Sequence, residues 1–231
     1  MISIVSAIWQ RPALTKIFLD SLVRYKKDYG INAVVAGSEK EKTRNMCIAR
    51  GIEYIETDNK PLSNKFNNAA RWARVLHKPK AFLILGSDDF LSDSFIQNYL
   101  TLLKYDVVGI TDCYFYHTQS KEAMYWKGYT NFRQGETIGL ARMLSREVYD
   151  KLNGKLWPQN MNSGLDYTMM QRLKKIHKFN SISLSVKDIG IAVDIKGQGN
   201  ITGFDCYRAN MAEIDESLFD CIPEFRRIKE L

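Results

Sequence analysis

The chain has 231 residues, of which 45% are hydrophobic and 26% are charged, as is typical of a globular protein with a sizeable core. Its 33 basic and 26 acidic side chains give a net charge of +7, which favours a polyanionic partner or substrate. No apolar run approaches the roughly 20 residues that a membrane-spanning helix needs. The N-terminus lacks the features of a secretion signal, so we expect a cytoplasmic protein without membrane insertion.

The cysteines and histidines show no spacing typical of a disulfide framework or a zinc site. Neither a Cys-x-x-Cys pair nor a His-Glu-x-x-His cluster occurs. We therefore expect all of them to be structural, with the cysteines packed as reduced thiols. The residues are Cys47, Cys113, Cys206, Cys221, His77, His117 and His177.

Strand-like and helix-like segments alternate along the first half of the chain. Apolar residues at helical spacing predict three helices, which begin near Pro12, at Ser63 and at Ser92 or Asp93. The alternation is typical of a mainly parallel sheet with helices on both faces. Strands are predicted at 2–8, 32–36, 53–56, 81–85 and 107–110.

The second half of the chain is less regular. An aromatic segment at 113–132 is interpreted as strands or loops over one edge of the sheet. Helices are expected at 145–152 and 166–177, and strands near 183–186 and 189–195. Because neither a linker nor an internal repeat divides the chain, we expect a single domain.

Polar and charged residues follow each of the first four predicted strands. Ligands of parallel sheets bind at the carboxyl ends of the strands, so one nucleotide could contact all four positions. The residues are Arg11 after the first strand, Gly37, Ser38 and Glu39 after the second, Asp58, Asn59 and Lys60 after the third, and Ser87, Asp88 and Asp89 after the fourth.

Asp88 and Asp89 stand out because they end an apolar strand as a pair. An aspartate at this position often closes a turn or caps the next helix. A single aspartate would serve a turn, however, and Ser92 is already available as a cap. The pair therefore favours a site for Mg²⁺ or Mn²⁺, which are commonly held by one or two carboxylates together with substrate phosphates.

Asp166 is a second candidate functional residue, at the start of a predicted helix. A carboxylate near a helix N-terminus is kept ionised, and an ionised carboxylate can accept a proton. The spacing Ser163-x-x-Asp166 equally matches a capping box, which requires no function. The spacing alone does not decide between a general base and a cap.

Two further features carry weaker signals. The segment Gly197-Gln198-Gly199-Asn200 lacks the third glycine of a dinucleotide-binding loop. It is more typical of an exposed turn than of a loop that brings Lys196 over a diphosphate. Trp126 lies among Tyr125, Lys127 and Tyr129, and of the four tryptophans it is the one best placed to stack on a ligand.

With these residues in view, the chain resembles the inverting GT-A glycosyltransferases of family 2. The resemblance implies an α/β fold of the GT-A type, which is a Rossmann-like nucleotide-diphospho-sugar transferase fold with a mainly parallel central sheet flanked by helices. It implies one domain over residues 1–231, with a nucleotide-binding half (1–110) and a half that binds the acceptor and carries the base (111–231). The matching segments are 5–12, 61–67, 87–89, 139–146 and 164–166.

The resemblance also implies roles for individual residues. Asp88 would lie near the ribose of the donor, Asp89 would bind a divalent metal (Mn²⁺ or Mg²⁺), and Asp166 would be the general base. Lys196 or Asp194 would complete the diphosphate or metal site. The expected nucleotide contacts are Arg11, Glu39, Asp58, Lys65 and Asn67.

These roles imply a metal-dependent hexosyl- or pentosyltransferase that moves one sugar from a nucleotide-diphosphate sugar to an acceptor hydroxyl. Ser87 stands where the family's Asp-x-Asp pattern has an acid, so the metal could bind less tightly or be less essential. The Gln-x-x-Arg-Trp motif of processive synthases is missing, which is why a single transfer is implied.

The sequence leaves more than one interpretation open for the acceptor and for the reaction class. A small basic transferase resembles the stand-alone enzymes with which some bacteriophages glycosylate hydroxymethylated DNA bases, and this slightly favours DNA over a glycan or a lipid-linked sugar. A nucleotidyltransferase that releases pyrophosphate would share the nucleotide-binding architecture and the paired acids. A non-catalytic module that binds nucleotides or nucleic acid would explain the charge but would leave Asp166 as a cap.

Overall fold

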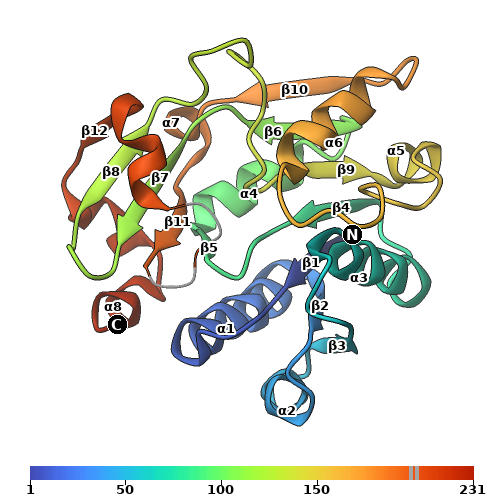
Figure 1. The fold of residues 1–231 in the computed structure, drawn as a ribbon, viewed down its shortest axis with the longest axis horizontal. Coiled ribbons are helices and arrows are strands. Elements are labelled where there is room, and N and C mark those ends of the chain that lie inside the picture. Colours follow the sequence, from blue (N-terminus) through green and yellow to red (C-terminus); the bar gives the residue numbers. More distant parts are fainter. Residues whose placement is uncertain (198–199, 201–202) are drawn as a thin grey trace.

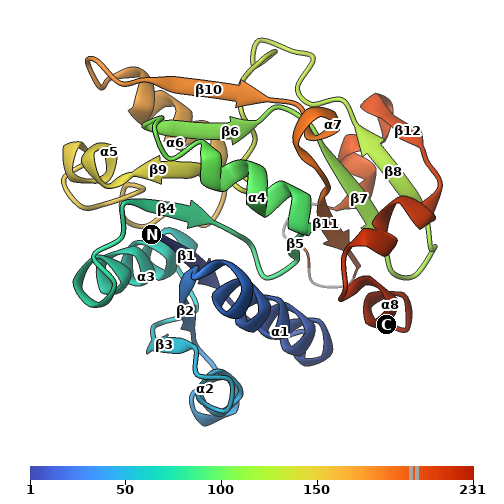
Figure 2. The same ribbon diagram turned by 180° about the vertical axis from the view of Figure 1, so that it is seen from behind.

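The computed structural model describes residues 1–197, 200 and 203–231, which form two β-sheets surrounded by helices (Figure 1, Figure 2). The Gly-rich segment 197–200 therefore lies partly outside the described residues. Within the described parts of the chain, no helix is long and apolar enough to cross a membrane.

The larger sheet has seven strands in the order β10-β6-β9-β4-β1-β2-β3. Neighbouring strands are parallel except on both sides of β9. The prediction of a mainly parallel central sheet is confirmed. The strands are β1 (Ile2–Ala7), β2 (Asn32–Gly37), β3 (Glu53–Glu56), β4 (Ala81–Ile84), β6 (Val107–Ile110), β9 (Met143–Ser145) and β10 (Ser181–Leu184).

The smaller sheet has five strands in the order β12-β8-β7-β11-β5, and all its pairs are antiparallel except β7 with β11. The aromatic segment at 113–132 supplies two of these strands. The chain enters this sheet directly after β4, so the end of β4 lies where the two sheets meet. The strands are β5 (Asp89–Leu91), β7 (Cys113–His117), β8 (Ala123–Trp126), β11 (Ala192–Lys196) and β12 (Met211–Glu213).

Helices cover both faces of the larger sheet, as predicted. Successive strand residues point to opposite faces, so Ile4 packs with the hydrophobic cluster under α1 and α4, and Val5 packs with the cluster under α3, α5 and α6. The α-helices are α1 (Pro12–Tyr29), α2 (Glu41–Ile48), α3 (Leu62–Leu76), α4 (Asp93–Thr101), α5 (Arg146–Lys151), α6 (Leu165–Lys174), α7 (Val186–Ile189) and α8 (Phe225–Lys229). Two 3₁₀ helices are η1 (Phe204–Asn210) and η2 (Glu216–Cys221).

The helix starts confirm one predicted cap and correct two. Ser92 caps α4 by accepting a hydrogen bond from the backbone N–H of Phe95 (3.3 Å). Ser63 does not cap α3, because the helix begins one residue earlier, at Leu62. The Ser63 hydroxyl instead accepts a hydrogen bond from the backbone N–H of Met161 (3.0 Å). The capping box at α6 is also absent, since the left-handed Gly164 precedes the helix and the Asp166 carboxylate is bound by side chains instead.

Two other expectations are correct only in part. Cys206 and Cys221 are exposed on surface 3₁₀ helices, so only Cys47 and Cys113 are buried packing residues. The strand expected near 183–186 ends at Leu184, and Val186 begins the short helix α7. That helix is capped by Ser185, whose hydroxyl accepts from the Lys187 N–H (3.2 Å).

Candidate active site

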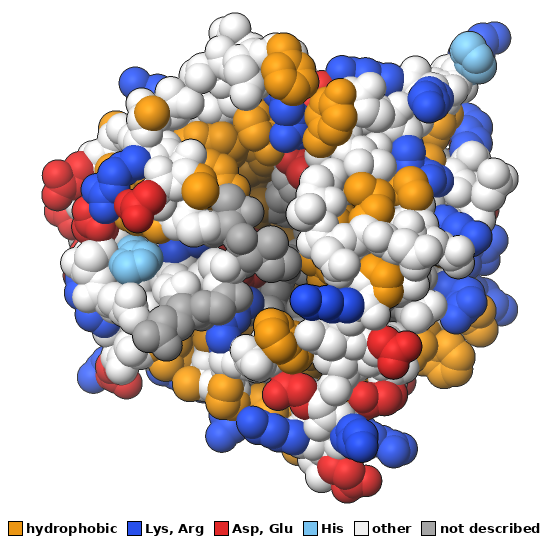
Figure 3. Space-filling model, in the orientation of Figure 1, with side chains coloured by type: hydrophobic (Ala, Val, Ile, Leu, Met, Phe, Trp, Pro, Cys, Tyr) orange, Lys and Arg blue, Asp and Glu red, His pale blue; other side chains and the backbone are white. Residues whose placement is uncertain are grey.

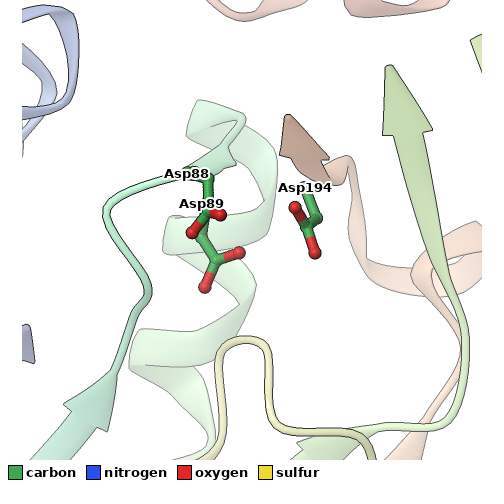
Figure 4. A group of neighbouring side chains, drawn as sticks. All are labelled: Asp88, Asp89 and Asp194. Carbon is green, nitrogen blue, oxygen red and sulfur yellow. The ribbon is translucent and has the colours of Figure 1, made fainter. Parts of the chain in front are cut away.

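Three aspartates gather where the two sheets meet. Asp89 is the first residue of β5, and it lies opposite Asp194 of β11 in antiparallel register. Carboxylate oxygens of Asp88, Asp89 and Asp194 all lie within 4.8 Å of one another, and Figure 4 shows the three side chains beside a common space. Like charges this close repel one another unless protons or a cation neutralise them.

The environment of these acids fits a hard divalent cation. Asp89 is buried and accepts a hydrogen bond from the Gly86 N–H (2.6 Å). Asp194 Oδ2 forms an ion pair with Lys196 Nζ (2.7 Å). Asp194 Oδ1 is buried without a hydrogen-bond partner among the described residues. An unpartnered buried carboxylate oxygen is costly in a folded protein, and oxygen ligands are those that Mg²⁺ and Mn²⁺ prefer.

Burial dominates the electrostatics of this cluster. It raises the pKa of Asp194 to about 6, although Lys196 pulls the value down and Asp88 pushes it up. Burial also raises the pKa of Asp89 well above its ordinary value, with repulsion from Asp194 and Asp88 adding to the effect. Both groups therefore favour a bound positive charge.

Asp88 is held differently from its two neighbours. Its Oδ2 accepts hydrogen bonds from Arg11 Nη1 (3.1 Å) and from Asn200 Nδ2 (2.7 Å). Arg11 Nη2 also donates to Ser87 Oγ (3.1 Å), so the loop after β1 is fixed to the end of β4. Asp88 is thus oriented by a cation and an amide.

A cavity of about 570 Å³ extends from this cluster to Asp166, and its volume lies within the range of small-molecule sites. Figure 3 shows the face of the molecule with a hollow near its centre. The structure therefore brings both halves of the predicted site to one cavity. The predicted site residues in its lining are Arg11, Lys65, Asp88, Asp89, Asp166, Asp194 and Lys196.

Three predicted nucleotide contacts do not line the cavity. Glu39 accepts a hydrogen bond from the Gln10 N–H (2.9 Å). Asp58 is exposed beside the cavity-lining Asn59. Asn67 is turned toward the backbone of Trp157, to which it donates a hydrogen bond (2.8 Å) and from which it accepts one (3.1 Å).

Lys65 reaches the cavity but is largely committed to the fold. Its side chain is 1% exposed, and Nζ donates to Ile8 O (2.8 Å), Ser38 Oγ (3.3 Å) and Asn59 Oδ1 (3.3 Å). Burial lowers its pKa to about 8. Lys65 thus joins the segments that follow β1, β2 and β3.

Asp166 also lines the cavity, from the first turn of α6. Its Oδ1 accepts a hydrogen bond from Arg142 Nη2 (2.5 Å). Its Oδ2 accepts hydrogen bonds from Tyr129 Oη (2.5 Å) and Arg133 Nη2 (3.0 Å). Burial alone would raise the pKa of Asp166, but Arg142, Tyr129 and Arg133 together hold it below its ordinary value. The carboxylate is therefore ionised at neutral pH.

Sequence reasoning did not identify most of the neighbours of these acids. Tyr129, Arg133 and Asn200 reach the site through long-range contacts, for which a single sequence carries no local signal. Trp126, in contrast, was predicted as a ligand contact from its unusual aromatic surroundings in the sequence. It lines the cavity together with Phe115 and Tyr207.

Comparison with known proteins identifies the fold. No family model matches the chain, and no curated protein sequence is similar to it. Among solved structures, a fragment of S. aureus TarS superposes with a TM-score of 0.60 at 14% identity, over 84% of this chain and 60% of that one. The chain spans only 36% of a longer TarS structure.

Two further structures agree. A protein from Desulfovibrio desulfuricans G20, described as a putative nucleotide-diphospho-sugar transferase, matches over 99% of this chain and 94% of that one, with a TM-score of 0.52 and 10% identity. Glucosyl-3-phosphoglycerate synthase from Mycobacterium tuberculosis, in complex with Mn²⁺, UDP and glucosyl-3-phosphoglycerate, matches over 84% and 71%, with a TM-score of 0.52 and 13% identity. The chain has the GT-A fold of nucleotide-diphospho-sugar transferases.

Proposed function

We propose that this protein is a metal-dependent, inverting glycosyltransferase that moves one sugar from a nucleotide-diphosphate sugar to an acceptor hydroxyl. The observation that carries the proposal is one cavity whose lining contains both an acidic cation site and an ionised aspartate outside that site. Structural neighbours with the same fold support it, one of them in complex with Mn²⁺ and UDP-glucose.

The donor would bind at the end of the cavity formed by the aspartate cluster. Asp89 and Asp194 would hold the cation, with the unpartnered Asp194 Oδ1 as one ligand, and Asp88 would face the ribose. The cation, when bound, neutralises charge on the departing nucleoside diphosphate. Arg11 and Lys196 add positive charge at the same end of the cavity, where preorganised electrostatics favours the transition state.

The acceptor would bind beside Asp166. Arg142 is buried and fixes Oδ1, which leaves Oδ2 as the oxygen that takes the acceptor proton. Tyr129 and Arg133 donate to Oδ2 in this structure, so the acceptor hydroxyl would replace one of them. With Asp166 assigned to the side of the anomeric carbon away from the diphosphate, the acceptor would attack from that side and invert the configuration.

The proposal is tested first by donor binding. Thermal unfolding is measured with each common nucleoside diphosphate, with and without Mn²⁺, because a ligand at 100 times its Kd stabilises the native state by about 2.7 kcal/mol. We expect one nucleotide to raise Tm only in the presence of Mn²⁺. The effect should be lost in Asp89→Asn and kept in Asp166→Asn. An equal rise in Asp89→Asn would refute the assigned cation site.

The reaction class is tested by the product. Consumption of the preferred nucleotide sugar should release the nucleoside diphosphate and should fall in Asp166→Asn. Release of pyrophosphate from a nucleoside triphosphate would instead identify a nucleotidyltransferase. Binding without turnover of any nucleotide sugar would indicate a binding module.

A further inference from the structure

The basic residues of the chain are concentrated in two segments. Residues 60–80 contain six Lys or Arg and no acidic residue, and residues 141–180 contain eight against three. The whole chain has 33 basic and 26 acidic residues, so the remainder is more acidic than basic. The positive charge is therefore local.

The two segments form one surface, which we call the basic flank (residues 60–80 and 141–180). The Ser63 N–H donates to Met161 O (2.9 Å), and the Arg146 N–H donates to Lys80 O (2.8 Å). The two hydrogen bonds between Asn67 and Trp157 lie between these points. Figure 3 shows basic side chains gathered along the edge of the molecule that α3, α5 and α6 form in Figure 1.

Most of this charge is not neutralised by the protein. Among the described residues, only two of the exposed basic side chains on the flank make an ion pair, namely Lys151 with Glu147 (2.8 Å) and Lys174 with Glu136 (2.6 Å). A surface with such an excess attracts polyanions and releases counterions when it binds them. The exposed basic residues are Lys60, Arg71, Lys78, Lys80, Arg146, Lys151, Lys155, Lys174, Lys175 and Lys178.

The basic flank reaches the cavity beside Asp166, the proposed base. Lys60, Asn162 and Asp166 of the flank line the cavity, and Asp166 lies in the first turn of α6. A phosphate chain held along the flank would therefore pass beside the proposed base.

Exposed aromatic rings also lie near Asp166. Phe132 is 82% exposed and Tyr167 is 42% exposed, and their ring centroids lie 6.1 Å apart in an edge-on arrangement. The Arg133 guanidinium stacks over Tyr129 (3.7 Å to the ring centroid). Large apolar side chains that remain exposed beside a cavity commonly mark a binding surface.

We propose that the basic flank and the Phe132–Tyr167 pair bind a nucleic-acid strand, and that the acceptor hydroxyl is carried by an unstacked base that enters the cavity beside Trp126. This inference rests on the proposed transferase function. Sequence-tolerant binding of single strands combines a basic groove for the phosphates with aromatic rings on which bases stack, and both lie beside Asp166. Enzymes that modify a base take it out of the stack and into a pocket.

The test measures binding of a fluorescent single-stranded oligonucleotide of about 20 nucleotides by anisotropy, without any donor. The variant Lys155→Glu/Lys175→Glu/Lys178→Glu should bind about tenfold more weakly or worse and show a smaller salt dependence. The matched control Lys27→Glu/Lys42→Glu/Arg44→Glu reverses three exposed charges on α1 and α2 and should bind nearly as wild type. Equal weakening in both variants would overturn the assigned surface.

Two more measurements decide the nature of the partner. Phe132→Ala/Tyr167→Ala should lose about tenfold in oligonucleotide affinity, because base–aromatic stacking contributes at this scale. Inorganic polyphosphate of equal charge and anionic phospholipid vesicles should compete poorly. If either competes as well as the oligonucleotide and the aromatic variant binds normally, the partner lacks bases and the inference is wrong.

The same assay separates this inference from the proposed function. Asp89→Asn should bind the oligonucleotide as wild type, because binding is measured without a donor and Asp89 belongs to the cation site. If the protein binds the oligonucleotide as expected but consumes no nucleotide sugar, the proposed transferase function is wrong. The nucleobase is then not an acceptor. Turnover of a nucleotide sugar without oligonucleotide binding would remove only the inference.

Discussion

Asp89 and Asp194 face each other across two antiparallel strands, although they belong to segments far apart in the chain. The backbone is joined at this point, because the Ile195 N–H donates to Asp88 O (2.8 Å). Directly opposed like charges destabilise a sheet. Their pairing is therefore explained better by a ligand that needs both carboxylates than by the stability of the fold.

The first prediction concerns this repulsion. Asp89→Asn keeps an oxygen that can accept from the Gly86 N–H, yet it removes one of three crowded charges. We expect the variant to be more stable than wild type in a chelator, by about 1 kcal/mol or more, because an unneutralised buried charge is costly. In excess Mn²⁺ the order should reverse, since only wild type gains binding energy.

Thermal unfolding with chelator and with Mn²⁺ measures both effects. Asp28→Asn, which alters an exposed carboxylate on α1, serves as the control and should show neither. Stabilisation of Asp89→Asn by Mn²⁺ to the same extent as wild type would contradict the assignment.

The second prediction concerns the base. Asp166→Asn should lower turnover of the preferred nucleotide sugar by roughly 10²–10⁴-fold, the usual contribution of a general base. Donor affinity should be unchanged, because Asp166 is not one of the clustered aspartates that form the proposed cation site. Turnover and Mn²⁺-dependent nucleotide binding are measured on the same preparation. Asp150→Asn, at an exposed position of α5, is the control carboxylate.

Much of the fold was predictable because its signals are local. Strands β1 to β4 and helices α1 and α3 follow from apolar runs and helical spacing that a few neighbouring residues define. The smaller sheet could not be predicted in the same way. Strands as short as β5 and β12, with three residues each, form only through partners that are distant in sequence. Helix α2 was missed because only Thr43 and Cys47 of its eight residues are buried, which leaves almost no apolar periodicity.

The candidate site divides in the same way. Asp88 and Asp89 were recognisable because they follow a strand, and the end of a strand in a parallel sheet is a fixed place. Asp194 could be named only through the resemblance, since its position opposite Asp89 depends on the pairing of β5 with β11. The partners of Asp166 depend on the conformation of the segment after β8, which no local pattern specifies.

The third prediction concerns acid stability. The pKa of Asp166 is lower in the folded protein than in the unfolded chain, where it is near 3.9. Its ionised form therefore stabilises the fold at every pH above the unfolded value, and this contribution is lost as the pH falls through the folded pKa. The difference in unfolding free energy between wild type and Asp166→Asn should shrink below about pH 4.

Urea unfolding at a series of pH values between about 3 and 6 measures this difference. The control is Asp28→Asn, which removes an exposed carboxylate of α1. A difference that stays constant over the whole series would show that the ion pairs of Asp166 do not contribute to stability.

The last prediction separates two roles for Asn67. The resemblance implies a nucleotide contact, whereas both polar atoms of its amide are bound to the backbone of Trp157. Asn67→Ala would leave a backbone N–H and a C=O unpaired, so we expect it to cost about 2 kcal/mol of stability. Nucleotide affinity should be unchanged, because Asn67 does not line the cavity.

Asn68→Ala is the matched control, since among the residues that the structure describes the Asn68 side chain accepts a hydrogen bond only from Arg71 (3.1 Å), at the surface. Urea unfolding and nucleotide binding are measured for both variants. If Asn67→Ala weakens nucleotide binding about tenfold while its stability matches that of Asn68→Ala, the side chain must turn toward the donor when the donor binds. Loss of stability alone would show that the helix position expected from the resemblance serves here to fix the Trp157 segment to α3.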